Sequence, residues 1–304
     1  MIARTPASFL EHFRAHSWEA DLPALPKGVF MVEPEAFYVD AESAADNPYM
    51  NLAQPADPNR ALAQSRALQA QIRAAGIPVK VFPGDAAAPD GIFPNNAFAT
   101  TPGQLLVGSM RHSGRRRETD RVDIRAWFAG QGYHLTDLSQ QPCVAELTGP
   151  MILDRARGIG FCGMSGRVDE AGLAAMHEAF GLRLTFAFGL QPGEYHANVV
   201  MSVLAGRACL LCAEAFADPA VPDAIEAVYP GRTLRLSPEA KNAFAANCIA
   251  LSDRHLFISR SGHDALPPAG VAQLGEWGFE LRVVELDEIE KAGGSLRCMV
   301  AEIF

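Results

Sequence analysis

Amphipathic segments alternate with apolar runs along most of the chain, and the same order of segments recurs five times. Each time, a pattern typical of an amphipathic helix is followed by a glycine and then by an apolar stretch typical of a strand. Glycine often follows a helix because it adopts the left-handed conformation without a Cβ clash. The five glycines are Gly76, Gly132, Gly181, Gly231 and Gly278. Their spacings, 56, 49, 50 and 47 residues by subtraction, indicate an internal repeat of about fifty residues.

Pairs of apolar runs lie between these segments, and a turn-like centre divides each pair. They read AFATTPGQLLVGSM, MILDRARGIGFCGM, NVVMSVLAGRACLLC and CIALSDRHLFISRS. Such pairs predict β-hairpins. We therefore expect each repeat to be a ββαβ unit, and five such units predict an α/β protein built as a five-bladed propeller with pseudo-fivefold symmetry.

A polar residue stands just before each hairpin, at nearly the same place in every repeat. From Asn95 the steps are 51, 50, 51 and 51 residues. The positions are Asn95–Asn96, Glu146, His196, Asn247 and Cys298. In a closed ring, equivalent positions face one axis, so these side chains are predicted to converge. Chance spacing in an ordinary α/β protein is the alternative.

The fifth repeat is short, because the predicted strand that begins at Cys298 is the last one in the sequence. We expect residues 28–76 to complete it with a strand, GVFMVEPEAFY, and a helix that ends at Gly76. The final run CMVAEIF would then close the ring.

Cysteine, histidine and glutamate together form a set suited to nucleophilic catalysis. A thiolate is the reactive form of cysteine, histidine shuttles protons near neutral pH, and a carboxylate can orient the histidine. The set predicts attack by Cys298 on an electrophilic sp² carbon, with a covalent intermediate. The alternative is structural, since a single buried cysteine or histidine most often only packs.

Composition narrows the class of protein. The chain has 304 residues, 49% of them hydrophobic, and a formal net charge of −9, which argues against a nucleic-acid partner. No apolar run reaches the length of a membrane span, and the first residues lack the apolar core of a signal peptide. Six cysteines without framework spacing suggest reduced thiols, so a cytoplasmic protein is expected. Cys209 and Cys212 lie in an apolar run typical of a buried strand, so no metal site is predicted.

One catalytic domain preceded by an N-terminal extension is expected. Residues 1–27 form an N-terminal extension in which Phe9, Phe13 and Trp18 make the apolar side of a short helix, followed by a proline-containing linker. Residues 28–304 form a single catalytic domain.

Several motifs make the chain resemble the guanidine-modifying superfamily of arginine deiminases, dimethylarginine dimethylaminohydrolases and amidinotransferases. They are GGSLRCM near the C-terminus, EYHANVV, AELTGPMILD and PDGIFPNNAF. The segment SAADNPYMN, the PNN motif and the ending GGSLRCMVAEIF are most similar to the citrulline ureidase branch. The resemblance spans residues 28–304 and implies the pentein fold, a five-bladed α/β propeller.

The resemblance also implies roles for individual residues. Cys298 would be the nucleophile, His196 the acid and base, and Glu146 the group that positions His196 and a substrate nitrogen. Asp90 and Asn96 would bind the guanidino or ureido end, and Arg167 would bind the α-carboxylate. Asn198 would be a substrate-binding residue at a position where deiminases often have aspartate.

Asn198 favours a neutral ureido group over a guanidinium cation, because a buried carboxylate without a counter-charge is costly. The implied reaction is hydrolysis of citrulline to ornithine, carbon dioxide and ammonia, with no cofactor. The alternative enzyme is a deiminase or dimethylaminohydrolase that acts on an arginine derivative. The alternative without catalysis is an inactive propeller that binds an amino acid. The only partner implied is the small-molecule amino-acid substrate. The sequence leaves open whether the chain forms a homo-oligomer. The chain departs from the superfamily pattern at Leu147, where glycine is expected.

Overall fold

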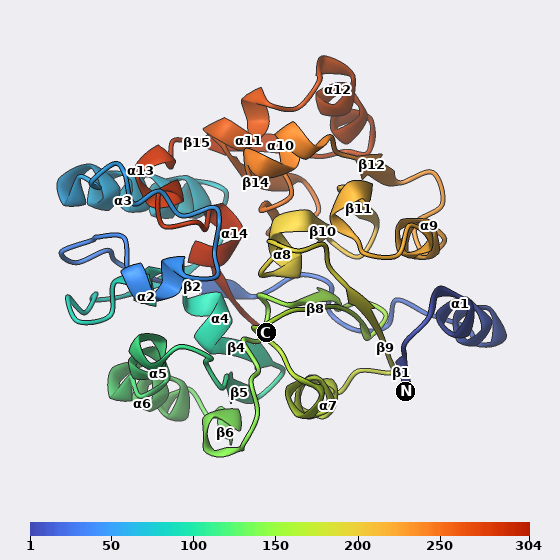
Figure 1. The fold of residues 1–304 in the computed structure, drawn as a ribbon, viewed down its shortest axis with the longest axis horizontal. Helices are drawn as coiled ribbons and strands as arrows, with labels where there is room; N and C mark the ends of the chain where they lie inside the picture. The colour runs from blue at the N-terminus through green and yellow to red at the C-terminus, as the bar shows by residue number, and fades with distance from the viewer.

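The strands fall into five separate sheets arranged around a common centre, with the C-terminus near the middle (Figure 1). The computed structural model describes residues 1–304 except for the side chain of Ala41. In chain order within each sheet, the strands are β2 (Gly28–Val32), β3 (Val79–Phe82) and β16 (Ala301–Ile303); β4 (Phe98–Thr101), β5 (Gln104–Val107) and β6 (His134–Asp137); β1 (Ile2–Ala3), β7 (Met151–Asp154), β8 (Ile159–Met164) and β9 (Leu184–Gly189); β10 (Met201–Leu204), β11 (Ala208–Leu211) and β12 (Thr233–Arg235); β13 (Ile249–Ala250), β14 (His255–Ser259) and β15 (Glu280–Val284).

Each sheet repeats one pattern of pairing: an antiparallel pair followed by a parallel pair that a helix connects. The connecting helices lie on the outside of the ring (Figure 1). They are α3 (Pro58–Ala74), α6 (Val122–Gly130), α7 (Glu170–Ala179), α9 (Ala220–Glu226) and α12 (Pro268–Glu276). The remaining helices are α1 (Pro6–Ala15), α2 (Ala41–Ala44), α4 (Pro94–Ala97), α5 (Ser113–Thr119), α8 (Ala197–Val200), α10 (Pro238–Asn242), α11 (Arg260–Asp264), α13 (Asp287–Glu290) and α14 (Leu296–Met299), with 3-10 turns η1 (Pro89–Ile92), η2 (Leu138–Gln140) and η3 (Ala213–Ala215).

The repeat predicted from the glycines is confirmed. All five follow the connecting helices with φ between 63° and 86°, a left-handed conformation that side chains with a Cβ disfavour. The predicted hairpins are present as β4–β5, β7–β8, β10–β11 and β13–β14.

The ring closes as expected, because β16 pairs antiparallel with β2 and β2 pairs parallel with β3. One detail of the prediction is wrong: Cys298 does not begin a strand. It lies in the short helical turn α14, and β16 begins three residues later at Ala301. The turns α4 and α8 precede β4 and β10 in the same way, so a helical turn, rather than the strand itself, carries the polar residues at these positions.

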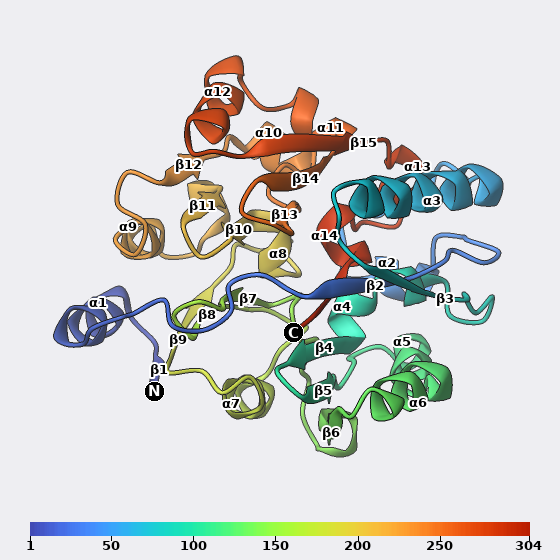
Figure 2. The same cartoon turned by 180° about the vertical axis from the view of Figure 1, so that it is seen from behind.

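Residues 1–27 pack along the outer part of the β7–β9 sheet and then cross the back of the ring toward β2 (Figure 2). β1 pairs parallel with β9, and the ring of Phe9 is fully buried and stacks on Phe186 at 4.5 Å. Phe13 and Trp18 pack against the same cluster, but α1 ends at Ala15, so Trp18 lies beyond the helix that was predicted to carry it. None of the helices in the described part of the chain combines the length and the apolar character needed to cross a bilayer.

Candidate active site

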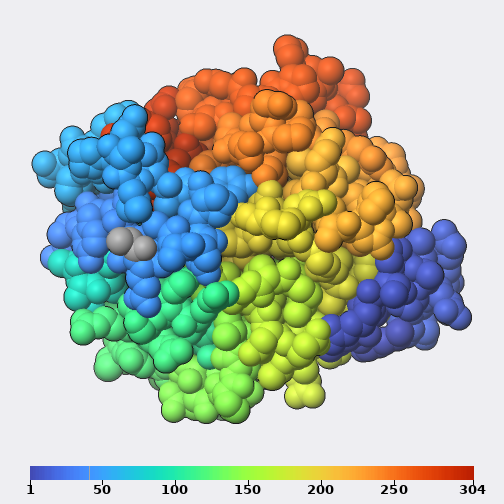
Figure 3. Space-filling model, viewed as in Figure 1, coloured from blue at the N-terminus to red at the C-terminus, as the bar shows by residue number. Residues whose placement is uncertain are grey.

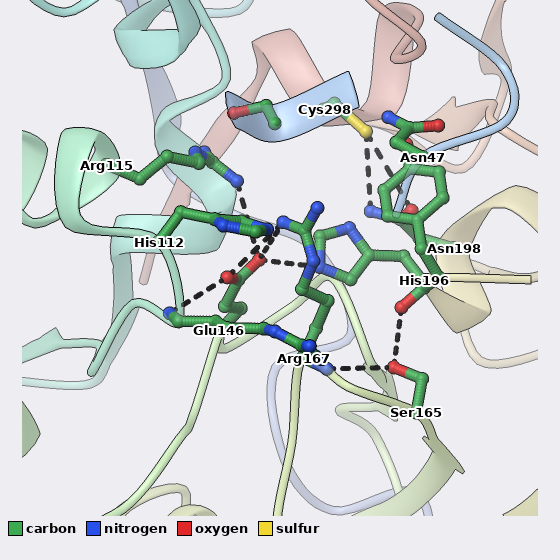
Figure 4. A network of polar contacts seen from close by, with 12 residues as sticks. Asn47, His112, Arg115, Glu146, Ser165, Arg167, His196, Asn198 and Cys298 are labelled. Atoms are coloured by element: carbon green, nitrogen blue, oxygen red, sulfur yellow. Dashed lines mark hydrogen bonds and ion pairs between the residues drawn. The ribbon is translucent and has the colours of Figure 1, made fainter. Parts of the chain in front are cut away.

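The polar residues that precede the hairpins meet at the centre of the ring (Figure 4). Glu146 lies in the loop before β7, His196 caps α8, Asn198 lies on α8 and Cys298 lies on α14. Each of the four is at most 1% exposed. Three of the register positions, Glu146, His196 and Cys298, therefore come together as predicted, and Asn198, which the resemblance added, lies with them (Figure 4).

Glu146 and His196 form a buried pair. Nε2 of His196 lies 2.9 Å from Oε2 of Glu146, so Nε2 carries the hydrogen and donates a hydrogen bond to the carboxylate. The other ring nitrogen, Nδ1, is buried without a hydrogen-bond partner among the described residues. Burial lowers the pKa of His196 to about 4, against the opposing effect of Glu146. The imidazole is therefore neutral near pH 7, with a free lone pair on Nδ1.

Gly149 makes room for this imidazole. A Cβ at Gly149 would lie 2.6 to 2.8 Å from three atoms of the His196 ring, which is closer than packing allows. The glycine in the sequence AELTGPM thus has a packing reason to be there. On the other side, the ring of Tyr195 lies 4.5 Å from that of His196.

Three further groups fix Glu146. Its carboxylate accepts from Nη1 of Arg167 at 3.2 Å, from Nη1 of Arg115 at 3.4 Å and from the backbone N–H of Arg111 at 3.2 Å. Burial alone would raise the pKa of Glu146, but Arg167, His196 and Arg115 outweigh it and hold the pKa well below its usual range. Glu146 is therefore ionised, and it orients His196.

Arg115 was not singled out from the sequence. It lies on α5 in the charged run RHSGRRRETDR. Its side chain is only 5% exposed and it forms a bidentate pair with the buried Glu118 at 2.8 and 2.9 Å. The glutamate three residues after the arginine was the available signal, because a helix places such residues on one face.

Leu147, the departure from the superfamily pattern, occupies an unusual backbone conformation. Its φ is +36°, in the left-handed region that favours glycine, and its side chain is fully buried. The backbone shape that glycine would adopt is thus retained with a leucine in place. Strain of this kind costs on the order of 1–3 kcal/mol and persists only where the surroundings enforce it.

The sulfur of Cys298 is held by two amides. Nδ2 of Asn247 lies 3.3 Å from Sγ, and Nδ2 of Asn198 lies 3.5 Å from it. Burial raises the pKa of the thiol, and the Asn247 and Asn198 amides and Arg297 oppose that rise. Among the described contacts Cys298 makes no hydrogen bond with His196, although both face the same space (Figure 4).

Asp90 and Asn96 lie near the same centre, and each has a buried side-chain oxygen without a hydrogen-bond partner among the described residues. Asp90 is 5% exposed; its Oδ2 accepts from Ser43 and lies 3.9 Å from Nε of Arg115. Oδ1 of Asp90 and Oδ1 of both Asn95 and Asn96 are buried and have no partner among the described residues. Burial raises the pKa of Asp90 against the effect of Arg115. Unpaired buried acceptors are costly, so this wall is suited to a ligand that brings N–H donors.

Arg167 is buried and already engaged. Besides Glu146, its guanidinium donates to Oδ1 of Asp46 at 2.5 Å and lies over the ring of Tyr195 at 5.5 Å. Asp46 also accepts from His112 at 3.0 Å and lies 3.5 Å from Arg111. A carboxylate of the chain itself therefore occupies the place that the resemblance reserves for the substrate carboxylate.

A segment formed by residues 40–51, here called the cover segment, lies across this face of the ring (Figure 3). Ser43 bonds Asp90, Asn47 donates to the Gly293 carbonyl, and Tyr49 donates to Glu194 at 2.6 Å. Met50 forms a bridge with Ala292. The cover segment thus contacts loops from several repeats and, with them, buries the candidate nucleophile.

Comparisons with known proteins agree with this geometry. The sequence model of one family, described as "N,N dimethylarginine dimethylhydrolase, eukaryotic", matches residues 33–304. A curated relative from Mycobacterium tuberculosis, named N(G),N(G)-dimethylarginine dimethylaminohydrolase, is 26% identical over 280 residues, covering 90% of this chain and 85% of that protein.

Solved structures share the fold. The product-bound N-terminal domain of ArgZ, an arginine dihydrolase from the ornithine-ammonia cycle in cyanobacteria, superposes with a TM-score of 0.80 at 22% identity, covering 93% of this chain and 98% of that one. A dimethylarginine dimethylaminohydrolase captured as an adduct with S-methyl-L-thiocitrulline gives a TM-score of 0.71 at 19% identity, covering 92% and 100%.

Proposed function

The chain belongs to the dimethylarginine dimethylaminohydrolase family of the guanidine-modifying superfamily, and from this we propose that it is a cysteine hydrolase of an arginine-related amino acid. It cleaves a C–N bond at the guanidino or ureido carbon, with Cys298 as the nucleophile. We assign the five sheets as blades of one α/β propeller, residues 28–304 as a single catalytic domain and residues 1–27 as an extension of it.

The observation that carries the proposal is the pairing of a buried thiol with an oriented neutral imidazole. Glu146 holds the Nε2–H of His196, which leaves the Nδ1 lone pair to accept and return protons. The Oδ1 atoms of Asp90, Asn95 and Asn96 are buried without a partner among the described residues, so each can accept a hydrogen bond from a substrate N–H. A guanidino or ureido group is a flat sp² carbon that carries several N–H groups, so it suits both sides.

Citrulline is the substrate we favour. Asn198 is neutral and holds the sulfur, and the carboxyl group of Asp90, which accepts from Ser43, already has Arg115 within 3.9 Å. A guanidinium would bring a second cation to a carboxylate that has one, in a site that excludes water. A neutral ureido group supplies the same N–H donors without that charge.

The reaction on citrulline proceeds in two steps. The sulfur of Cys298 attacks the ureido carbon and its proton passes to His196. His196 returns this proton to the departing nitrogen as the C–N bond to the ornithine side chain breaks, which leaves a carbamoyl thioester on Cys298. Water, deprotonated by His196, attacks the thioester; carbamate leaves, the thiol is restored, and carbamate decomposes to carbon dioxide and ammonia.

Arg167 is the proposed ligand of the substrate α-carboxylate, and Asp46 is the group it must exchange. Arg167, Arg111 and His112 surround a single carboxylate, that of Asp46. When a substrate carboxylate takes that position, Asp46 leaves and the cover segment shifts with it.

A dimethylarginine dimethylaminohydrolase is the second candidate, and the named M. tuberculosis relative favours it. Incubation with citrulline, arginine, methylarginines and agmatine decides between them. Ornithine formed from citrulline, and lost in Cys298→Ser, supports the first proposal; citrulline formed from methylarginine supports the second. Failure of every compound, with a Cys298 that resists iodoacetamide at neutral pH, would indicate an amino-acid-binding protein without catalysis.

A further inference from the structure

Asn247 occupies the fourth of the five equivalent ring positions and contacts the reacting atom directly. It is fully buried, and its Nδ2 lies 3.3 Å from Sγ of Cys298, the shorter of the two amide contacts to that sulfur. The proposed reaction gives Asn247 no part in proton transfer or substrate binding. What it can supply is an N–H donor to a sulfur that must carry negative charge when it attacks.

The orientation of the Asn247 amide is fixed by its backbone partners. Its Oδ1 accepts from the backbone N–H of Arg297 at 3.0 Å, and its Nδ2 donates to the carbonyl of Asn198 at 2.9 Å. A flipped amide would place two acceptors together and two donors together. One hydrogen of Nδ2 therefore serves the Asn198 carbonyl, and the second points toward Sγ at 3.3 Å and Oδ1 of Asn198 at 3.4 Å.

Asn198 presents its own amide to the sulfur in the same sense. Its Nδ2 donates to the Thr148 carbonyl at 3.2 Å, which leaves the other hydrogen for Sγ at 3.5 Å. Its Oδ1 lies 3.4 Å from Nδ2 of Asn247 and 3.8 Å from Sγ, where it accepts from the resting thiol. An aspartate at either position would bring a negative charge to the sulfur instead.

We propose that Asn247 is a further catalytic residue, which together with Asn198 forms an amide cradle that stabilises the anionic sulfur of Cys298. The inference rests on the proposed function only in taking Cys298 as the nucleophile. Because His196 is neutral and makes no described hydrogen bond to Cys298, the cradle replaces a cysteine–histidine ion pair as the source of stabilisation.

Other charged or titratable groups near the sulfur are few. Arg297 lies on α14 beside Cys298, but its guanidinium is turned toward the Val300 carbonyl and Glu302. Tyr195 and His196 precede α8, and Glu146 lies behind His196. Of the elements packed against α14, α4 contributes the neutral Asn95 and Asn96, and the titratable residue of β14, His255, contacts Arg282 at 3.1 Å.

The test is the pH dependence of Cys298 alkylation by iodoacetamide, followed by mass spectrometry of the Cys298 peptide. Asn247→Asp keeps the acceptor for Arg297 but turns the donor into a charged oxygen, and Asn247→Ser removes the reach to Sγ without adding charge. In Asn247→Ser we expect the rate at neutral pH to fall about ten- to a hundredfold, with the profile shifted upward in pH. Asn247→Asp should fall further.

Gln69→Glu is the matched control, because Gln69 is a buried amide on α3 away from the sulfur; its Cys298 profile should stay that of the parent. Circular dichroism identifies variants that fail to fold. A folded Asn247→Ser and a folded Asn198→Asp that both keep the parental profile would overturn the proposal. Alkylation is measured without substrate, so a shifted profile in a protein that turns over no ureido or guanidino compound would reject the proposed function and leave the cradle standing.

Discussion

The two sides of the site hold their reactive groups by different physical means. Around Glu146 and His196 the structure uses full charges: two guanidiniums and a backbone N–H converge on one carboxylate. Around Cys298 it uses neutral amides from Asn198 and Asn247. The charged side fixes the position of a neutral imidazole, and the neutral side surrounds the sulfur that we propose as the nucleophile. Each side thus avoids an uncompensated charge in the resting protein.

Removal of the nucleophile gives the largest expected effect and tests whether the neutral side is the reacting one. Cys298→Ser should lower citrulline hydrolysis by at least about 10³-fold, because a buried hydroxyl is a far weaker nucleophile than a thiol. Ornithine production reports the loss. Cys143→Ser, outside the site, is the control and should keep full activity. A Cys298→Ser variant that hydrolyses citrulline would show that Cys298 is not the nucleophile.

Glu146→Gln tests the charged side. The amide can no longer balance Arg167 and Arg115, and it holds His196 less firmly, so we expect kcat to fall about 10²- to 10⁴-fold. Arg167 and Arg115 keep Asp46 and Glu118 as partners but lose the buried carboxylate that they share, so Tm should fall. Calorimetry measures the change in Tm, and citrulline turnover measures the change in kcat. A Gln variant with parental Tm would mean that the charge cluster contributes nothing to stability.

The pH dependence of stability separates the two sides again. The pKa of His196 is about 4 in the folded protein, below its unfolded value of about 6.5, so the unfolded chain binds more protons between these values. The contribution of His196 is therefore complete above about pH 6.5 and is lost as the pH falls toward 4. Denaturant unfolding of parent and His196→Asn should show a shallower loss in the variant over that window. Equal slopes would contradict a buried neutral imidazole.

Leu147 gives the smallest expected effect and concerns the loop that carries Glu146. Both Leu147→Gly and Leu147→Ala lose a buried side chain, at a cost of about 2–5 kcal/mol. Because φ is positive, glycine should be the better replacement by about 1 kcal/mol, the reverse of its usual rank. Denaturant midpoints of the two variants measure the difference. Alanine equal to or better than glycine would show that the loop is unstrained.

The fold was largely predictable because its signals are local and repeated. Gly132 or Gly181 alone would say little, but five glycines in register define the unit, and the residues before the hairpins inherit that register. The site was predictable only to the extent that it follows the repeat. Asn247 was recognised as a ring position, but its contact with the sulfur depends on the helical turn that carries Cys298 where a strand was expected.

Groups that reach the centre from outside the repeat were missed. Arg115 comes from a helix in a charged run, and Asp46 comes from the cover segment, which follows no periodic pattern. The spacing of Arg115 and Glu118 singles out one arginine of RRRE on a helix face, but it does not reveal that this face turns inward. That choice depends on partners such as Glu146, 31 residues further along the chain.

The pairing of β16 with β2 also has a consequence for biosynthesis. Ile303 lies opposite Gly28, so the sheet of β2, β3 and β16 stays open until residues 301–303 have left the ribosome. Contacts of such high sequence separation form late and slowly. Cys298 is translated after every other residue named for the site, and its two amides can meet it only when the ring shuts. A nascent chain therefore lacks the proposed amide cradle around Cys298 until β16 pairs with β2.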